Sequence, residues 1–151
     1  QEFRVSVPTI SFGIAIAEPE VLNTMDPELL DGVMSAVANW GAAGQEDLIQ
    51  RLKDEYGEPW MTQNAISTYG DMWVFKAALE ESCSRDREAL GEALRNLDGG
   101  PSEYYPGGTI SFDDMGRREG ASLTIIQWQE GVPVTVFPEE LAVAAPKWPT
   151  E

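Results

Sequence analysis

The chain has 151 residues, of which 42% are apolar and 24% are charged, so it has enough apolar material for the core of one domain. Its 26 acidic and 10 basic side chains give a formal net charge of −16, which disfavours nucleic acid and anionic membranes as partners. With no histidine and with Cys83 as its single cysteine, the sequence excludes histidine-dependent nucleophilic and zinc sites, internal disulfides and iron–sulfur clusters. We therefore expect no nucleic-acid partner and no cofactor.

The first third of the chain combines strand and loop signals. The β-branched residues over 5–13 predict a strand, and the proline-containing segment 14–23 predicts a loop. An Asp-Pro pair predicts one short helical turn over 26–31, because aspartate favours the N-cap and proline the first helical position. The nearly continuous apolar run 32–39 predicts a strand covered on both faces.

The middle of the chain predicts three helices. Apolar side chains at helical spacing predict one helix over 45–56 and a second over 59–82. Gly70 within the second costs about 1 kcal/mol relative to alanine, which indicates either a weaker helix or a close packing contact. A third helix is expected to begin at Asp86. The side chains expected to face the core are Leu48, Ile49, Leu52, Tyr56, Tyr69, Trp73, Phe75, Leu90, Ala93, Leu94 and Leu97.

The last third changes to a period of two, which is typical of strands. Strands are predicted over 109–112, 123–129 and 132–137, joined by turns at 113–116 and 130–131. Prolines after this region predict an irregular tail.

No group of residues carries a specific catalytic or metal-binding signature. Residues 113–116 begin like a calcium loop, but they lack the alternating oxygen donors and closing glutamate of an EF-hand, so a hairpin turn is favoured. The acid pairs 18/20 and 139/140 could serve as a general acid and base, although neighbouring acids in loops are usually solvated. Cys83 has no accompanying base and is interpreted as a half-buried packing residue. Asn39 and Trp40 follow a buried strand, where open α/β sheets place ligand crevices; packing is the favoured role of Trp40, and lining a site is the alternative.

Several short motifs, in order, resemble a known family. They are Gly32-Val33-Met34, Tyr56-Gly57-Glu58-Pro59, Asp86-Arg87-Glu88-Ala89-Leu90, Gly107-Gly108-Thr109-Ile110-Ser111-Phe112-Asp113-Asp114-Met115-Gly116, Ile126-Gln127-Trp128-Gln129-Glu130-Gly131 and Val136-Phe137-Pro138. This order and spacing resemble the C-terminal part of a type I periplasmic solute-binding protein, of the branched-chain amino acid ABC-transporter receptor group. No single motif is specific, but together they extend over essentially the whole chain.

The resemblance implies an α/β fold with pieces of two Rossmann-like lobes, which close around a ligand in the complete receptor. On that template, residues 1–34 belong to the second lobe, 35–124 to the first lobe, and 125–151 return to the second. The chain would complete neither sheet, so we expect it to associate with a missing N-terminal half or with a copy of itself. It would be a fragment whose targeting signal lies upstream.

The implied function is that of a periplasmic or cell-surface, non-enzymatic component of an ABC importer, with a small-molecule ligand and an ABC permease as partners. In amino-acid receptors that this chain resembles, a carboxylate in the loop corresponding to Gly13–Ala15 meets the ligand amine. No acid occurs here before Glu18, so either Glu18 binds the amine from a shifted position or the ligand lacks an ammonium group. The apolar loop and Trp40 favour the second option, for instance an aromatic acid or an amide. The ligand-binding residues expected are Gly13, Ile14, Ala15, Glu18, Asn39 and Trp40.

Two other functions compete with this one. A ligand-sensing regulatory protein of the same fold, of the amide-sensor type, would share every feature above and differ in its partner. An enzyme that works through two carboxylates is disfavoured, because no convergent acid pair is evident.

Overall fold

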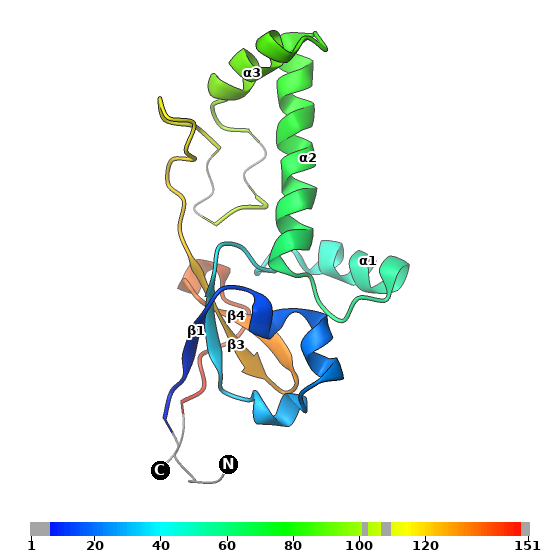
Figure 1. The fold of residues 1–151 in the computed structure, drawn as a ribbon, viewed down its shortest axis with the longest axis vertical. Coiled ribbons are helices and arrows are strands. Elements are labelled where there is room, and N and C mark those ends of the chain that lie inside the picture. The colour runs from blue at the N-terminus through cyan, green and yellow to red at the C-terminus, as the bar shows by residue number, and fades with distance from the viewer. Residues whose placement is uncertain (1–6, 101–102, 107–109, 149–151) are drawn as a thin grey trace. The chain divides into compact units, whose positions relative to one another are not determined.

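The computed structural model describes residues 7–100, 103–106 and 110–148 (Figure 1). The chain divides into two compact units, one formed by residues 1–63 with 123–151 and the other by residues 64–122. The unit boundary between residues 122 and 123 falls close to the predicted lobe boundary at 124–125. The unit boundary between residues 63 and 64 falls well beyond the predicted lobe boundary at 34–35. The predicted boundaries concern the lobes of a complete receptor, and they stay a prediction.

The first unit is built on a four-stranded mixed sheet. In order across the sheet, its strands are β1 (Ile10–Phe12), β2 (Met34–Val37), β3 (Thr124–Gln129) and β4 (Val132–Phe137). β1 runs parallel to β2, whereas β3 is antiparallel to both β2 and β4. The strands predicted near these positions are confirmed; of the predicted segment 5–13, residues 5–6 lie outside the described part, and the strand occupies only 10–12.

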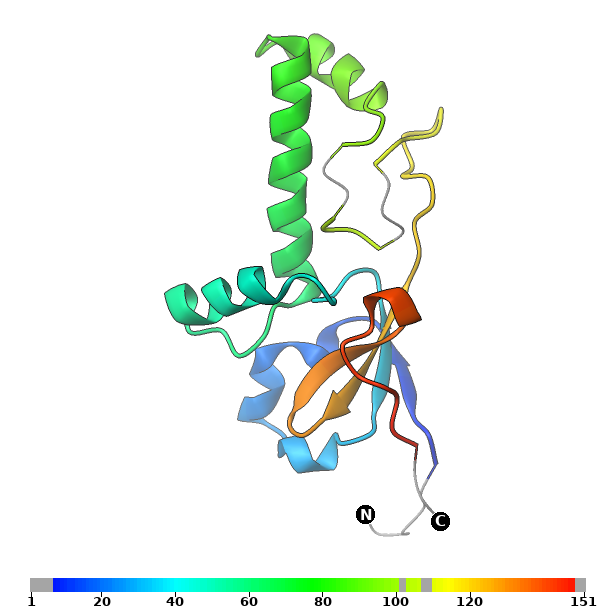
Figure 2. The ribbon, with the colours of Figure 1, turned by 180° about the vertical axis from the view of Figure 1, so that it is seen from behind.

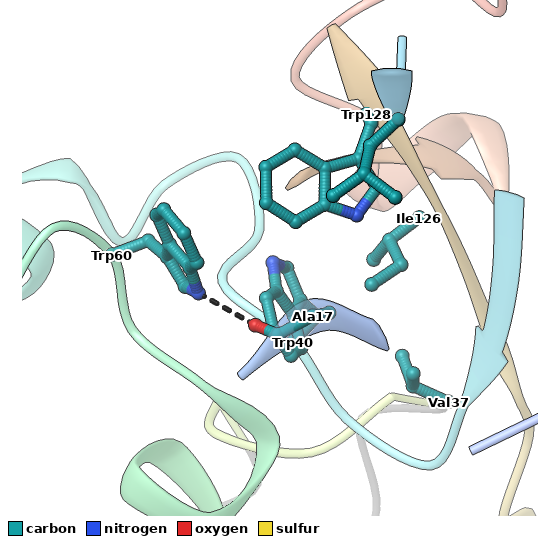
Figure 3. Packing of buried hydrophobic residues seen from close by; sticks show 7 residues of the cluster. Ala17, Val37, Trp40, Trp60, Ile126 and Trp128 are labelled. Carbon is teal, nitrogen blue, oxygen red and sulfur yellow. Dashed lines mark hydrogen bonds between the residues drawn. The ribbon is translucent and has the colours of Figure 1, made fainter. Parts of the chain in front are cut away.

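One face of this sheet carries the apolar core of the unit. Ser35 pairs with Ile126 and Val37 with Thr124, and directly paired residues project to the same face. The buried cluster on that side contains Ala17, Leu30, Val37, Trp40, Trp60, Ile126 and Trp128 (Figure 3). Strand residues from both ends of the chain therefore share a single core.

The other face of the sheet binds the C-terminal tail through two buried glutamines of β3. The Gln127 amide donates to the Lys147 carbonyl at 2.7 Å and accepts from the Lys147 N–H at 2.8 Å. Gln129 donates to the Ala145 carbonyl at 2.9 Å. The tail, red in Figure 2, is irregular as predicted, but these amides tie its backbone to the sheet.

The predicted loop after β1 contains short 3₁₀ turns. These are η1 (Ala15–Ala17) and η2 (Pro19–Asn23), followed by η3 (Pro27–Leu29). Within the predicted loop 14–23, Pro19, whose missing N–H is tolerated in a first helical turn, begins η2 and does not act as the predicted breaker. The predicted turn near Pro27 is confirmed, with Asp26 accepting the Glu28 N–H at 3.0 Å.

Helix α1 (Glu46–Tyr56) confirms the first predicted helix, and Gly57 ends it with a φ of +71° that favours glycine. Its apolar stripe is only half-buried, and Tyr56 is exposed, so the expectation that Tyr56 faces the core is wrong. Tyr56 occupies the last turn, which extends past the small core. A further short turn, η4 (Glu139–Leu141), follows β4.

The second unit contains α2 (Gln63–Ser82), most of which lies in it, and α3 (Arg87–Arg95). Both helices confirm the prediction, and Asp86 caps α3 by accepting the N–H groups of Glu88 and Ala89 at 3.0 Å each. Trp73 and Phe75 of α2 are exposed, so the expectation that they are core residues is wrong. Among the described residues, no helix is long and apolar enough to cross a membrane.

The predicted strand over 109–112 is wrong where it can be seen. Thr109 lies outside the described residues, and the only pairing of the segment 110–112 is an isolated bridge between Phe112 and Arg118. The predicted turn at 113–116 is present: Asp113 accepts the N–H groups of Met115 and Arg117 at 2.9 and 2.8 Å. One bridged residue pair does not make a strand, so the alternating apolar pattern of this segment is not enough to form one without a longer paired partner.

Gly70 provides the close packing contact that its place in a helix suggested. A Cβ at this position would lie 2.8 Å from ring atoms of Tyr105. Tyr105 donates its hydroxyl to Asp71, and the Arg118 guanidinium lies 5.4 Å from the centre of its ring. Burial, together with the hydrogen bond to Asp71, raises the pKa of Tyr105, so the phenol stays protonated.

We expect Gly70→Ala to lower the free energy of unfolding by about 1–3 kcal/mol, because overpacking a rigid ring outweighs the gain in helix propensity. Gly91→Ala in α3 is the matched control, since its Cβ would meet only the end of Arg95 at 3.8 Å. That change should be neutral or stabilising. Urea unfolding of the two variants measures both effects, and equal midpoints would contradict the packing role of Gly70.

Candidate functional site

The chain turns away from β1 at Gly13, the first of the predicted site residues. Gly13 has a φ of +98°, a conformation that favours glycine. Its N–H donates to the Ala36 carbonyl at 2.9 Å, and its carbonyl accepts the Ser35 hydroxyl at 2.6 Å. These bonds fix the start of the loop to β2, and the loop then runs toward the core.

Two buried indoles hold the backbone that follows. Trp128 donates its N–H to the Ile16 carbonyl at 3.1 Å. Trp60 donates its N–H to the Ala17 carbonyl at 2.9 Å (Figure 3). The two rings meet edge to face, with centres 5.5 Å apart. Aromatic pairs of this geometry add about 0.5–1.5 kcal/mol beyond their burial. Since both indoles bond to the two residues before Glu18, they fix where its side chain begins.

Among the residues that the structure describes, 7–100, 103–106 and 110–148, two buried side-chain atoms lack a hydrogen-bond partner, Oε1 of Glu18 and Oγ1 of Thr124. Burial is the main cause that raises the pKa of Glu18, and the nearby carboxylates of Glu20 and Glu58 raise it further. Leaving a buried acceptor unpaired costs about 1–3 kcal/mol, and more when it is charged. A hydrogen-bond donor or a positive charge placed at Oε1 of Glu18 would remove that cost.

An ammonium group matches these properties, since it would supply both the missing donor and the compensating charge. Nothing in the described part of the chain groups three or more histidine, cysteine or acidic side chains so that they could hold a metal ion. The acid pair Glu139 and Glu140 lies exposed in η4, as ordinary solvated surface does.

The structure places Asn39 and Trp40 in the interior of the first unit. The Asn39 side chain accepts the Trp40 N–H at 3.0 Å, and the Trp40 indole donates to the Pro133 carbonyl at 3.1 Å. Trp40 belongs to the same buried cluster as Ala17, and Ile14 packs against this cluster. The indole N–H, the only side-chain donor of Trp40, is used within the core, which fits the packing interpretation. Ala15 is exposed.

Sequence reasoning missed Trp60 and Trp128 as residues that position the loop. Both are buried, yet each lies far along the chain from residues 16–17, and no local pattern connects them. The available signal is chemical, because a buried indole N–H requires an acceptor. Cys83, predicted to be half-buried, is exposed at a positive φ of 47° beyond α2.

Comparison with known proteins places this geometry in context. No protein-family model matches the chain. It is 28% identical over 120 residues to the Leu/Ile/Val-binding protein homolog 7 of Brucella suis biovar 1, and 25% identical over 123 residues to homolog 8 of Brucella abortus. These matches include 80% and 78% of this chain but 30% of each relative. The chain thus spans under a third of the length of the relatives it matches.

Solved structures show the same fold. A leucine binding protein of Thermotoga maritima superimposes with a TM-score of 0.59 at 21% identity, over 83% of this chain and 36% of that one. An ABC transporter substrate-binding protein of Desulfitobacterium hafniense gives a TM-score of 0.60 at 20% identity, over 89% and 37% of the two chains. The predicted resemblance and the predicted partial type I periplasmic-binding-protein fold, of the α/β class, are both confirmed.

Proposed function

We propose that this chain is part of a substrate-binding component of an ABC importer, and that it binds the ammonium group of a small solute through Glu18. The observation that carries the proposal is the buried, unpartnered Oε1 of Glu18 at the end of a loop fixed by two indoles. The similarity to Leu/Ile/Val-binding proteins supports a solute-binding role. Gly13, Ile14 and Ala15 would shape the approach to the carboxylate.

The solute class follows from the two options that the sequence left open. The apolar loop and Trp40 together support a ligand without an ammonium group, but the Trp40 indole packs in the core and donates to the Pro133 carbonyl. Glu18, in contrast, has a buried oxygen that lacks a donor. An amino acid or another small organic acid that carries an amine therefore fits better than an aromatic acid or an amide.

The remaining features of the proposal follow from the role of importer component. The protein would act outside the cytoplasm, deliver its solute to an ABC permease and catalyse no reaction. A ligand-sensing regulatory protein of the same fold would instead deliver its signal to a cytoplasmic partner. The relatives are named for solute binding and the structural neighbours for ABC transport, which favours the importer.

The chain would also need further polypeptide to complete its sheet. Strand β1 has three residues and, among the described strands, pairs only with β2. An open strand edge favours pairing with another chain. The missing N-terminal half of a longer receptor, or a second copy, would supply that pairing.

Calorimetric titration of the full-length product of the gene that encodes this chain tests the proposal. We expect an L-amino acid to bind with nanomolar to micromolar affinity and its deaminated analogue to bind at least ~30-fold more weakly. Tight binding of solutes that lack an amine, with none for amino acids, would contradict the ammonium role of Glu18. Failure of every small solute in the panel would contradict solute binding itself.

A further inference from the structure

Three buried hydroxyl groups lie on the core face of the sheet in the first unit. Ser35 and Thr135 both pair with Ile126, and directly paired residues project to the same face. Thr124 shares that face, because it pairs with Val37, which packs in the same core as Ile126 (Figure 3). Ser35 and Thr135 each donate to a backbone carbonyl at 2.6 Å. The Thr124 Oγ1 has no hydrogen-bond partner among the described residues.

The missing partner of Thr124 carries a cost because the side chain is only 1% exposed. Folded proteins pair the large majority of their buried polar side-chain atoms, since bonds to water that are lost on burial must be replaced. Valine has nearly the same shape, favours strands and would carry no such cost. A threonine is therefore unfavourable here unless its hydroxyl bonds to a partner outside the described part of the chain.

Thr124 lies at the edge of the sheet where the loop 13–18 begins. β1 and β2 run parallel and end at this edge, and open α/β sheets bind ligands outside the carboxyl ends of such strands. The Gly13 N–H bonds to the Ala36 carbonyl and continues the pairing of β1 with β2, which places Gly13 beside Val37. Gly13 and Thr124 therefore flank Val37, about 10 Å apart at the usual strand spacing of about 4.8 Å.

We propose that Thr124 is a second contact of the solute, and that its hydroxyl donates to an acceptor oxygen, which in an amino acid is the carboxylate. The inference rests on the proposed function, in which Glu18 binds the amine. An ionised carboxylate only accepts hydrogen bonds, whereas a hydroxyl can donate one. The two buried, unpartnered oxygens of the described chain thus match the two polar ends of an amino acid.

Thr124→Val tests this assignment in the full-length receptor, by calorimetric titration and by urea unfolding without solute. The substitution keeps the shape of the side chain but removes the hydroxyl, so we expect the tightest-binding amino acid to bind at least ~10-fold more weakly. The solute-free variant should unfold at the same or a higher urea concentration, because no bond is lost in that state. Thr124→Ser keeps the hydroxyl and should retain affinity within ~3-fold of the wild type.

Thr135→Val is the matched control, because Thr135 is equally buried on the same face but donates to the Gly41 carbonyl. It should unfold at lower urea and bind the solute with unchanged affinity. Unchanged affinity in Thr124→Val, with binding by the wild type intact, would overturn the role of Thr124 and leave the proposed function standing. If that variant also unfolded at lower urea, the hydroxyl would bind an internal water instead. A wild-type receptor that binds no small solute would overturn both.

Discussion

Replacing Trp128 with alanine is expected to lower the free energy of unfolding by about 3–5 kcal/mol, the largest stability effect of any single change considered. Trp128 is fully buried in the first unit, where its ring meets Trp60 edge to face and its N–H bonds to the Ile16 carbonyl. The substitution removes all of these contacts and leaves a cavity that a four-stranded sheet with short turns cannot close.

Trp148→Ala is the control for that experiment, because it deletes the same atoms at a site that is 60% exposed. Its expected effect is within about 0.5 kcal/mol. Guanidinium unfolding followed by far-ultraviolet circular dichroism avoids dependence on tryptophan fluorescence, which both changes alter. Similar losses in the two variants would mean that Trp128 does not anchor the core as its contacts indicate.

Features that depend on neighbouring residues alone could be predicted from the sequence. Asp26 and Asp86 as N-caps and Gly57 as a helix end rely on hydrogen bonds or dihedral angles within a few residues, and all three are present. Helical periodicity also located α1 and α2. It could not tell which stripe of a helix is covered, because both sides of α2 are apolar, and Trp73 and Phe75 were therefore misplaced.

The candidate site could be predicted only in part, for a similar physical reason. Glu18 could be named because it is the first acid after the β1 loop. The burial of its Oε1 could not be predicted from the sequence, because that burial depends on contacts made across the fold. Trp60 lies 43 residues from the carbonyl it binds and Trp128 lies 112 residues from its own, separations that no local pattern encodes.

Glu18→Gln is expected to weaken solute binding by the full-length receptor at least ~30-fold, since loss of one partner from a buried charge pair costs about 2–5 kcal/mol. The amide keeps the shape of the side chain but removes the charge that an ammonium group would pair with. Glu20→Gln is the matched control: Glu20 is exposed two residues away and should change affinity less than ~3-fold. Isothermal titration with the tightest-binding amino acid measures both.

The same substitution should have the opposite effect on the stability of the solute-free chain, and the two signs together identify a binding carboxylate. The pKa of Glu18 is raised above its ordinary value of 4.5, so the folded protein disfavours the charged form. That penalty is present at pH values above the folded-state pKa and disappears as the pH falls below 4.5. Glu18→Gln should therefore unfold at higher urea than the wild type at pH 7, and the two midpoints should converge by about pH 4. A carboxylate kept for structure would instead lose stability at pH 7 when it is neutralised, and that result would leave the weakened binding without an electrostatic explanation.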